Sequence, residues 1–241
     1  MNAFAYPTDQ ASLNLYKAGG WTTVLFLLYS MAALLLLAFL PGGYPETATE
    51  CFDMIRENRF LAFLQLDILS VVAIPFYFLL FFSLCQALKT RHALTAQIAL
   101  FCTLAGITVF IADVNIVSIL RLADNYELTD SPERKQQLLA ACEGMLASDM
   151  WINSGAILRG IFIETGALLF SVLMLKTSVF SRATGLVGIL THGFDLASVL
   201  AGVFYAPVKE VFTMTAGPLY LVWFAMVGLR LFALGKKRSP R

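Results

Sequence analysis

The stretch INSGAILRGIFIETGALLFSVLML, residues 152–175, decides the fold class. A membrane-spanning helix needs about 20 mostly apolar residues, and this stretch meets that length. It nevertheless contains Arg159 and Glu164, although a charge at mid-membrane costs roughly 3 kcal/mol. The stretch therefore predicts a membrane-spanning helix that carries part of a polar site.

Five further stretches are long and apolar enough to span a bilayer. They cover residues 21–40, 61–87, 93–120, 183–205 and 211–234. Hydrophobic residues make up 59% of the 241-residue chain and charged residues only 14%, far from the average soluble domain. We therefore expect one all-α domain over residues 1–241, a polytopic membrane bundle of six helices. The near-neutral chain, with a net charge of +1, has no extended basic surface for nucleic acid.

Lysines and arginines in the short loops predict the orientation, since they are enriched on the cytoplasmic side. With a cytoplasmic N-terminus, that side holds Lys17, Lys89, Arg91, Lys176, Arg182, Lys236, Lys237, Arg238 and Arg241. The other side holds the smaller set of Arg56, Arg59, Arg121, Arg134, Lys135 and Lys209. We expect a multi-pass membrane protein with both termini in the cytoplasm.

The two longer outer loops contain cysteines and a helix signal. Asp130-Ser-Pro-Glu133 has cap-forming residues before a proline suited to a first helical turn, and residues 134–145 follow. This predicts a short amphipathic helix in the second outer loop. Cys51 and Cys142 both fall outside the membrane, where disulfides persist, so we expect a bridge between them.

Two segments match at a constant offset. Residues 66–77 (LDILSVVAIPFY) and 194–205 (FDLASVLAGVFY) share six of twelve positions, including Asp67/Asp195 and Ser70/Ser198. If spans one to three repeat as spans four to six, the second copy is inverted, as in many secondary transporters. The alternative is coincidence, because membrane segments share a small alphabet.

Small and polar residues form one face of the fifth span. Gly185, Gly188, His192, Asp195 and Val199 recur at spacings of three and four, which places them along one side of a helix. Small residues allow two helices to approach closely in a membrane. We therefore expect this face to pack against other helices.

Ionisable residues within the apolar stretches define the candidate binding site. They are Asp67, Asp113, Arg159, Glu164, His192 and Asp195. A buried guanidinium keeps its proton, so we expect Arg159 to pair with at least one of Asp67, Asp195 or Glu164. Glu164 lies closest to the middle of the membrane and is the first candidate for handling a proton or cation.

A family resemblance appears in two regions. The pattern from Arg59 through Asp67 to Lys89, the turn Phe180-Ser-Arg-Ala-Thr-Gly185 leading to Gly193, and the long loop after the third span resemble the bacterial membrane family named domain of unknown function 4386. The resemblance implies a bacterial inner-membrane protein of six or seven helices and implies no known activity.

Three classes of function fit these residues. The first is binding or transport of a small solute or ion, and the second is a structural or accessory subunit among other membrane subunits. The third is an intramembrane enzyme built on Ser154 and His192. Motifs for nucleotide, zinc or other metal binding are absent from the sequence, so we expect no cofactor. We expect membrane lipids to be the general partner.

Overall fold

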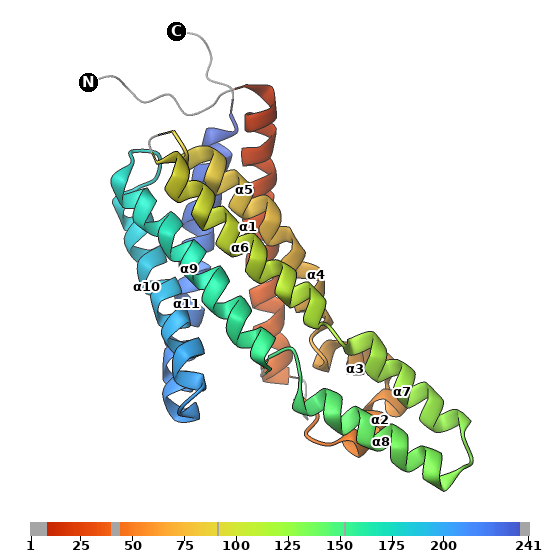
Figure 1. The fold of residues 1–241 in the computed structure, drawn as a ribbon. Helices are drawn as coiled ribbons and strands as arrows, with labels where there is room; N and C mark the ends of the chain where they lie inside the picture. Colours follow the sequence, from red (N-terminus) through yellow and green to blue (C-terminus); the bar gives the residue numbers. More distant parts are fainter. Residues whose placement is uncertain (1–8, 40–43, 91, 152, 237–241) are drawn as a thin grey trace.

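All regular secondary structure in the described part of the chain is helical. The computed structural model describes residues 9–39, 44–90, 92–151 and 153–236 (Figure 1). Six of its helical segments are long and apolar enough to cross a membrane, which confirms the predicted class. The bundle consists of α1 (Gln10–Phe39), α5 (Tyr77–Leu88), α6 (Ala93–Asp113), α9 (Ser154–Lys176), α10 (Arg182–Gly202) and α11 (Ala206–Leu234).

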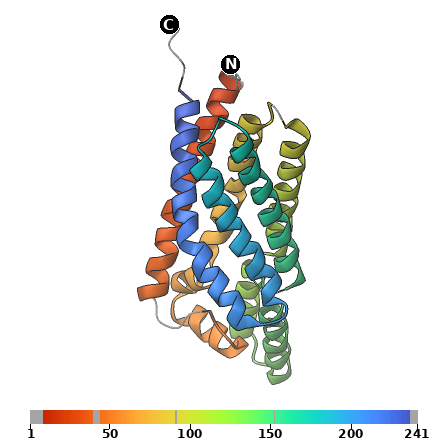
Figure 2. The same cartoon turned by 90° about the vertical axis from the view of Figure 1, so that its left-hand side faces the viewer.

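These six helices form a ring that follows the order of the chain. Each packs against the next one, α11 closes the ring against α1, and α5 also contacts α9 across the interior (Figures 1 and 2). Large buried side chains fill the centre, among them Tyr16, Phe26, Phe81, Phe170 and Trp223. The first and last helices meet at one end, because Gly235 lies against Leu13 and Lys17.

Four shorter helices form a second cluster at the other end of the bundle. They are α2 (Ala48–Glu57), α3 (Arg59–Gln65), α7 (Ile116–Leu128) and α8 (Pro132–Ala147). Their shared core includes Phe52, Leu66 and Ile119, and Figure 1 shows α7 and α8 reaching beyond the bundle. On the surface, Arg59 Nη1 lies 2.7 Å from Asp124 Oδ1 and ties α3 to α7. We name α2, α3, α7 and α8 the end cluster.

Helix α8 occupies the segment for which a loop helix was predicted. Ser131 precedes it, and its hydroxyl accepts a hydrogen bond from the Arg134 amide while Pro132 fills the first helical position. The helix packs against α7 and α2. Where it lies relative to a membrane surface stays a prediction.

The second predicted span is not one continuous helix. It is divided into α3, α4 (Ile68–Ala73), the 3-10 turn η1 (Ile74–Phe76) and α5. Asp67 separates α3 from α4 in a left-handed conformation with φ 62°. Pro75 lies within η1 and has no amide hydrogen to donate, so an ordinary helix does not continue through it.

The third predicted span, residues 93–120, is also broken. Helix α6 ends at Asp113, Val114 is extended with ψ 120°, and α7 begins at Ile116. The first predicted span is shorter than the observed helix, because α1 begins at Gln10 rather than near residue 21.

The two segments of the sequence repeat have different local structures. Asp67 caps α4 where the helix is interrupted, whereas Asp195 lies inside the continuous helix α10. The 3+3 inverted repeat therefore stays a prediction without support from local conformation.

Candidate functional site

The six candidate residues separate into three groups rather than one site. The first group joins α9, α10 and α11 through Glu164, His192, Asp195 and Tyr220. His192 Nδ1 lies 2.7 Å from Glu164 Oε2, and these two residues are only 2% and 5% exposed. The Tyr220 hydroxyl lies 3.0 Å from the same Glu164 oxygen and 2.7 Å from Asp195 Oδ2. We call these four residues the proton network.

Aromatic rings enclose the histidine end of the proton network. The His192 ring meets Trp223 edge to face at 4.6 Å and Tyr220 at 5.4 Å. Gly188 lies on the same face of α10, where a Cβ would come within 2.5 Å of Trp223 Nε1. The glycine therefore makes room for the tryptophan that covers His192. Asp195, at the other end, is partly exposed.

Arg159 belongs to the second group, and its predicted ion pair is not formed. Within the described ranges, no acid makes a salt bridge with it. Its guanidinium instead contacts two neighbouring rings, with Cζ 4.7 Å from the centroid of Phe110 and 4.3 Å from that of Trp151. Cation–π contacts of this kind are worth about 0.5–2 kcal/mol each, so the rings replace the expected acid.

Asp113 lies close to Arg159, at the C-terminal end of α6. A Cβ on Gly155, in the first turn of α9, would come within 1.7 Å of Asp113 Oδ2. The carboxylate therefore lies directly against the start of α9. Asp113 Oδ2 and Arg159 Nη1 are both buried without a hydrogen-bond partner in the described structure.

Asp67 forms the third group with two hydroxyl residues. Its Oδ2 accepts a hydrogen bond of 2.6 Å from Ser70 Oγ, which lies 2.6 Å from the Tyr29 hydroxyl on α1. Its Oδ1 accepts from the Ser70 amide at 3.2 Å and so caps α4. This group stabilises the break in the second span and anchors it to α1.

The predicted serine–histidine pair is not formed. Ser154 is exposed at the start of α9, and His192 is bound to Glu164, which lies ten residues, or about 15 Å, further along that helix. Ser154 makes no hydrogen bond to His192 in the part of the chain that the structure describes, so the arrangement gives no support to a hydrolytic enzyme.

The predicted disulfide between Cys51 and Cys142 is not supported. Both residues are free, buried thiols in the core of the end cluster, and Cys85 and Cys102 are free as well. Contact with Cys142, together with burial, raises the pKa of the Cys51 thiol. Cys51 therefore stays protonated at neutral pH and is a poor nucleophile.

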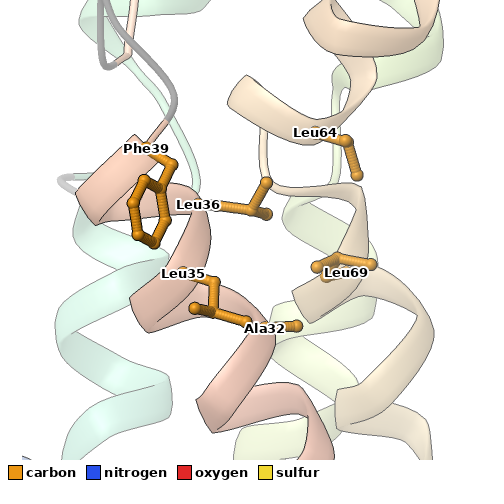
Figure 3. Close-up of a pocket in the computed structure, with 6 residues that line it drawn as sticks. All are labelled: Ala32, Leu35, Leu36, Phe39, Leu64 and Leu69. Atoms are coloured by element: carbon orange, nitrogen blue, oxygen red, sulfur yellow. The ribbon is translucent and has the colours of Figure 1, made fainter.

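An apolar groove of about 490 Å³ lies between α1 and the segment α3–α4, near the third group (Figure 3). Its lining contains no charged side chain and consists of Ala32, Leu35, Leu36, Phe39, Leu64 and Leu69. The groove suits apolar chains rather than a polar solute. Among the described residues, no group of three or more His, Cys, Asp or Glu side chains could hold a metal ion.

Sequence reasoning missed the hydroxyl and aromatic partners of the charged residues. Tyr220 and Tyr29 complete two of the groups, and Trp151 and Phe110 complete the third. A tyrosine in an apolar span is itself a signal, because a buried phenol usually has a hydrogen-bond partner. Comparisons with protein-family models, curated proteins and solved structures found no match to this chain. The resemblance to domain of unknown function 4386 therefore stays a prediction.

Proposed function

We propose that this protein is a proton-linked membrane transporter of a small solute or ion, with the proton network as its proton-carrying part. One observation carries the proposal. A single hydroxyl, that of Tyr220, lies within hydrogen-bonding distance of carboxylate oxygens from both Glu164 and Asp195.

Counting protons explains why this arrangement supports the proposal. The Tyr220 hydroxyl has one hydrogen and can donate it to only one of the two carboxyl groups. The other contact is a hydrogen bond only if that carboxyl is itself protonated and donates to the phenol oxygen. Both contacts of the Tyr220 hydroxyl are therefore hydrogen bonds when one of the two carboxyl groups, Glu164 or Asp195, is protonated and the other is ionised.

The proton network also joins buried residues to a residue that is partly exposed. Glu164 and His192 are sealed inside the bundle, whereas Asp195 is partly exposed. A proton passed through Tyr220 would move between these two environments, and His192 can donate to or accept from Glu164 through Nδ1. Chains of intramembrane carboxylates and histidines serve as proton relays in pumps and transporters.

Proton movement in reconstituted vesicles tests the proposal. Vesicles containing the protein and an internal pH-sensitive dye would receive sodium chloride, magnesium chloride or a mixture of amino acids. We expect one of these probes to change the internal pH, and Glu164→Gln to reduce the change to the level of protein-free vesicles. Glu133→Gln, on the exposed first turn of α8, is the matched control and should behave like the natural chain. A pH change that persists in Glu164→Gln, or no change with any probe, would falsify proton-linked transport.

A structural role is the second candidate function, and the burial of the proton network favours it. The hydrogen bonds join three helices, and Glu164 and His192 are almost fully buried. Buried polar pairs of this kind can fix how helices align. In that case Glu164→Gln would lower the free energy of unfolding, and vesicles with the natural chain would show no pH change.

We further propose that the protein spans the bacterial inner membrane with both termini in the cytoplasm and the end cluster outside. The excess of lysine and arginine near the termini supports this orientation. The contact of Gly235 with Leu13 and Lys17 agrees with it, because it brings the first and last helices together at one end.

A further inference from the structure

The apolar groove between α1 and the segment α3–α4 has the size of a small-molecule site (Figure 3). Sites of that kind enclose about 300–1,000 Å³ and are mainly apolar, with a few polar groups that orient the ligand. The groove volume of 490 Å³ falls within that range, and its lining supplies the apolar part. A polar group beside the groove would complete a site for an amphipathic molecule.

The break in the second span lies in one wall of the groove. Leu64 of α3 and Leu69 of α4 both line the groove, and Asp67 lies between them in the sequence. The Asp67 amide donates a hydrogen bond of 3.1 Å to the Leu64 carbonyl. Asp67 is therefore held directly beside the groove wall.

Tyr29 connects the other wall, on α1, to the same carboxylate. It precedes Ala32 by three positions and Leu36 by seven, so these residues share one face of α1. Ala32 and Leu36 line the groove. The Tyr29 hydroxyl lies 2.6 Å from Ser70 Oγ, which donates to Asp67 Oδ2 at 2.6 Å. The carboxylate and the two hydroxyls therefore lie at the end of the groove nearest Tyr29.

The negative charge of Asp67 has no direct counter-ion. Within residues 9–39, 44–90, 92–151 and 153–236, no basic side chain forms a salt bridge with it. The charges of Asp149 and Arg159 act on Asp67 with opposite sign, and that of Asp149 is the stronger. Each Asp67 oxygen accepts one hydrogen bond from Ser70 and keeps further lone-pair capacity. A cation in the groove could therefore pair with Asp67.

The groove is accessible from the lateral surface of the bundle. Leu35 and Phe39 of its lining are 54% and 79% exposed. Exposed apolar side chains on a membrane-spanning helix face lipid. A molecule dissolved in the bilayer can therefore enter the groove without crossing water.

These features select one class among the molecules that dissolve in a membrane. A neutral apolar chain would fill the groove but would leave Asp67 without a counter-ion. A phospholipid carries an anionic phosphate in its head, which Asp67 would repel. An alkyl chain with an ammonium head fills the groove and pairs with the carboxylate.

We infer that the groove binds an amphipathic organic cation, with its alkyl chain against the lining and its ammonium head beside Asp67. Because Ser70 Oγ donates to Asp67, the Tyr29 hydroxyl donates to Ser70, and the phenol oxygen can accept a hydrogen bond from the ammonium. The site includes none of the four residues of the proton network. The inference therefore goes beyond the proposed transport and does not rest on it.

Decylamine, decanol and decanoate provide a matched test, because they share one alkyl chain and differ in the charge of the head. At neutral pH the amine is positive, the alcohol neutral and the carboxylate negative. The protein in lipid nanodiscs would be dialysed to equilibrium against radiolabelled decylamine, with empty nanodiscs of the same lipids as background. We expect unlabelled decanol and decanoate to displace the label about tenfold less effectively than unlabelled decylamine.

Two variants separate the head from the chain. Asp67→Asn removes the charge, so we expect it to weaken decylamine binding about tenfold and to leave binding of radiolabelled decanol unchanged. Ala32→Phe places a ring in the groove and should weaken binding of both compounds. Asp130→Asn, on an exposed loop, is the matched control and should bind like the natural chain.

Any of four results would overturn the inference. They are no decylamine binding above the background, equal competition by all three compounds, equal weakening of decylamine and decanol in Asp67→Asn, and unchanged binding in Ala32→Phe. Equal competition would instead identify the groove as a site for lipid acyl chains. None of these measurements uses a pH gradient, so failure of the groove site is distinguished from failure of proton-linked transport.

Discussion

Asp67 combines an unusual backbone with two hydrogen-bonded roles. Its φ of 62° and ψ of 43° lie in the left-handed region, which is unfavourable for residues with a Cβ but tolerated by Asp and Asn. The same carboxylate accepts from the Ser70 amide and hydroxyl. The side chain therefore stabilises both the turn and the start of α4.

Substitutions at Asp67 should separate these contributions. Asp67→Ala loses the cap and keeps the unfavourable conformation, so we expect the free energy of unfolding to fall by about 2 kcal/mol. Asp67→Asn can cap and tolerates the left-handed region, so its loss should stay below about 0.5 kcal/mol. Denaturant unfolding in detergent micelles measures both values. Equal losses for the two variants would show that neither the cap nor the backbone conformation matters here.

The partners of Arg159 were only partly predictable from sequence. Residue depth along a span placed it near Glu164, but the two are five positions apart, which turns their side chains about 140° from each other around α9. Arg159 consequently faces α6, where Phe110 lies, while Glu164 faces α10 and His192. Helical periodicity could have excluded their pairing, whereas the choice of aromatic partners depends on tertiary packing.

Helix α9 is the element that separates the two polar sites. On one side Gly106 and Gly166 bring α6 and α9 together, with a Cβ on Gly106 falling 2.8 Å from the Arg159 carbonyl. On the other side, Gly160 lies against Val199 of α10 and Gly188 lies against Ser171. The predicted small-residue face of the fifth span is thus confirmed as a packing face.

Two glycines of α10 provide a matched test of this packing. A Cβ on Gly188 would lie 2.3 Å from Ser171 Oγ, whereas a Cβ on Gly193 would meet nothing within 4 Å. We expect Gly188→Ala to lower the free energy of unfolding by about 1–3 kcal/mol through overpacking. Gly193→Ala should be neutral or stabilising by up to about 1 kcal/mol, since alanine favours helix.

Unfolding of both variants in the same detergent gives the comparison. If Gly188→Ala were as stable as Gly193→Ala, α9 and α10 would not approach as closely as the structure shows.

The helix breaks were harder to predict than the spans, although their residues were visible. Pro75 and the pattern Asp67-x-x-Ser70 mark the ends of α4, and Asp113 and Asn115 flank the break before α7. Apolar residues continue across each break, so hydropathy alone reads one span where the structure has separate helices. Helix-capping residues and proline indicate where the helices end, whereas hydropathy does not.

At the scale of the whole molecule, the end cluster lies at the opposite end of the six-helix ring from the contact between the start of α1 and the end of α11. An even number of crossings puts the start of α1 and the end of α11 on the same side, and Gly235 lies against Leu13 there. The number of spans followed from sequence because length and hydropathy determine it. The end cluster did not, because α7 reads as the continuation of a membrane helix yet packs against α2 and α8.

Cysteine labelling tests how this molecule is oriented in a membrane. Asp130→Cys lies between α7 and α8, and Lys236→Cys follows α11, and both positions are exposed. In spheroplasts, a membrane-impermeant thiol reagent should label Asp130→Cys at once and Lys236→Cys only after the membrane is permeabilised. The unsubstituted chain gives the background, which should be low because Cys51, Cys85 and Cys142 are buried. Immediate labelling of Lys236→Cys, with Asp130→Cys protected, would mean that the end cluster faces the cytoplasm.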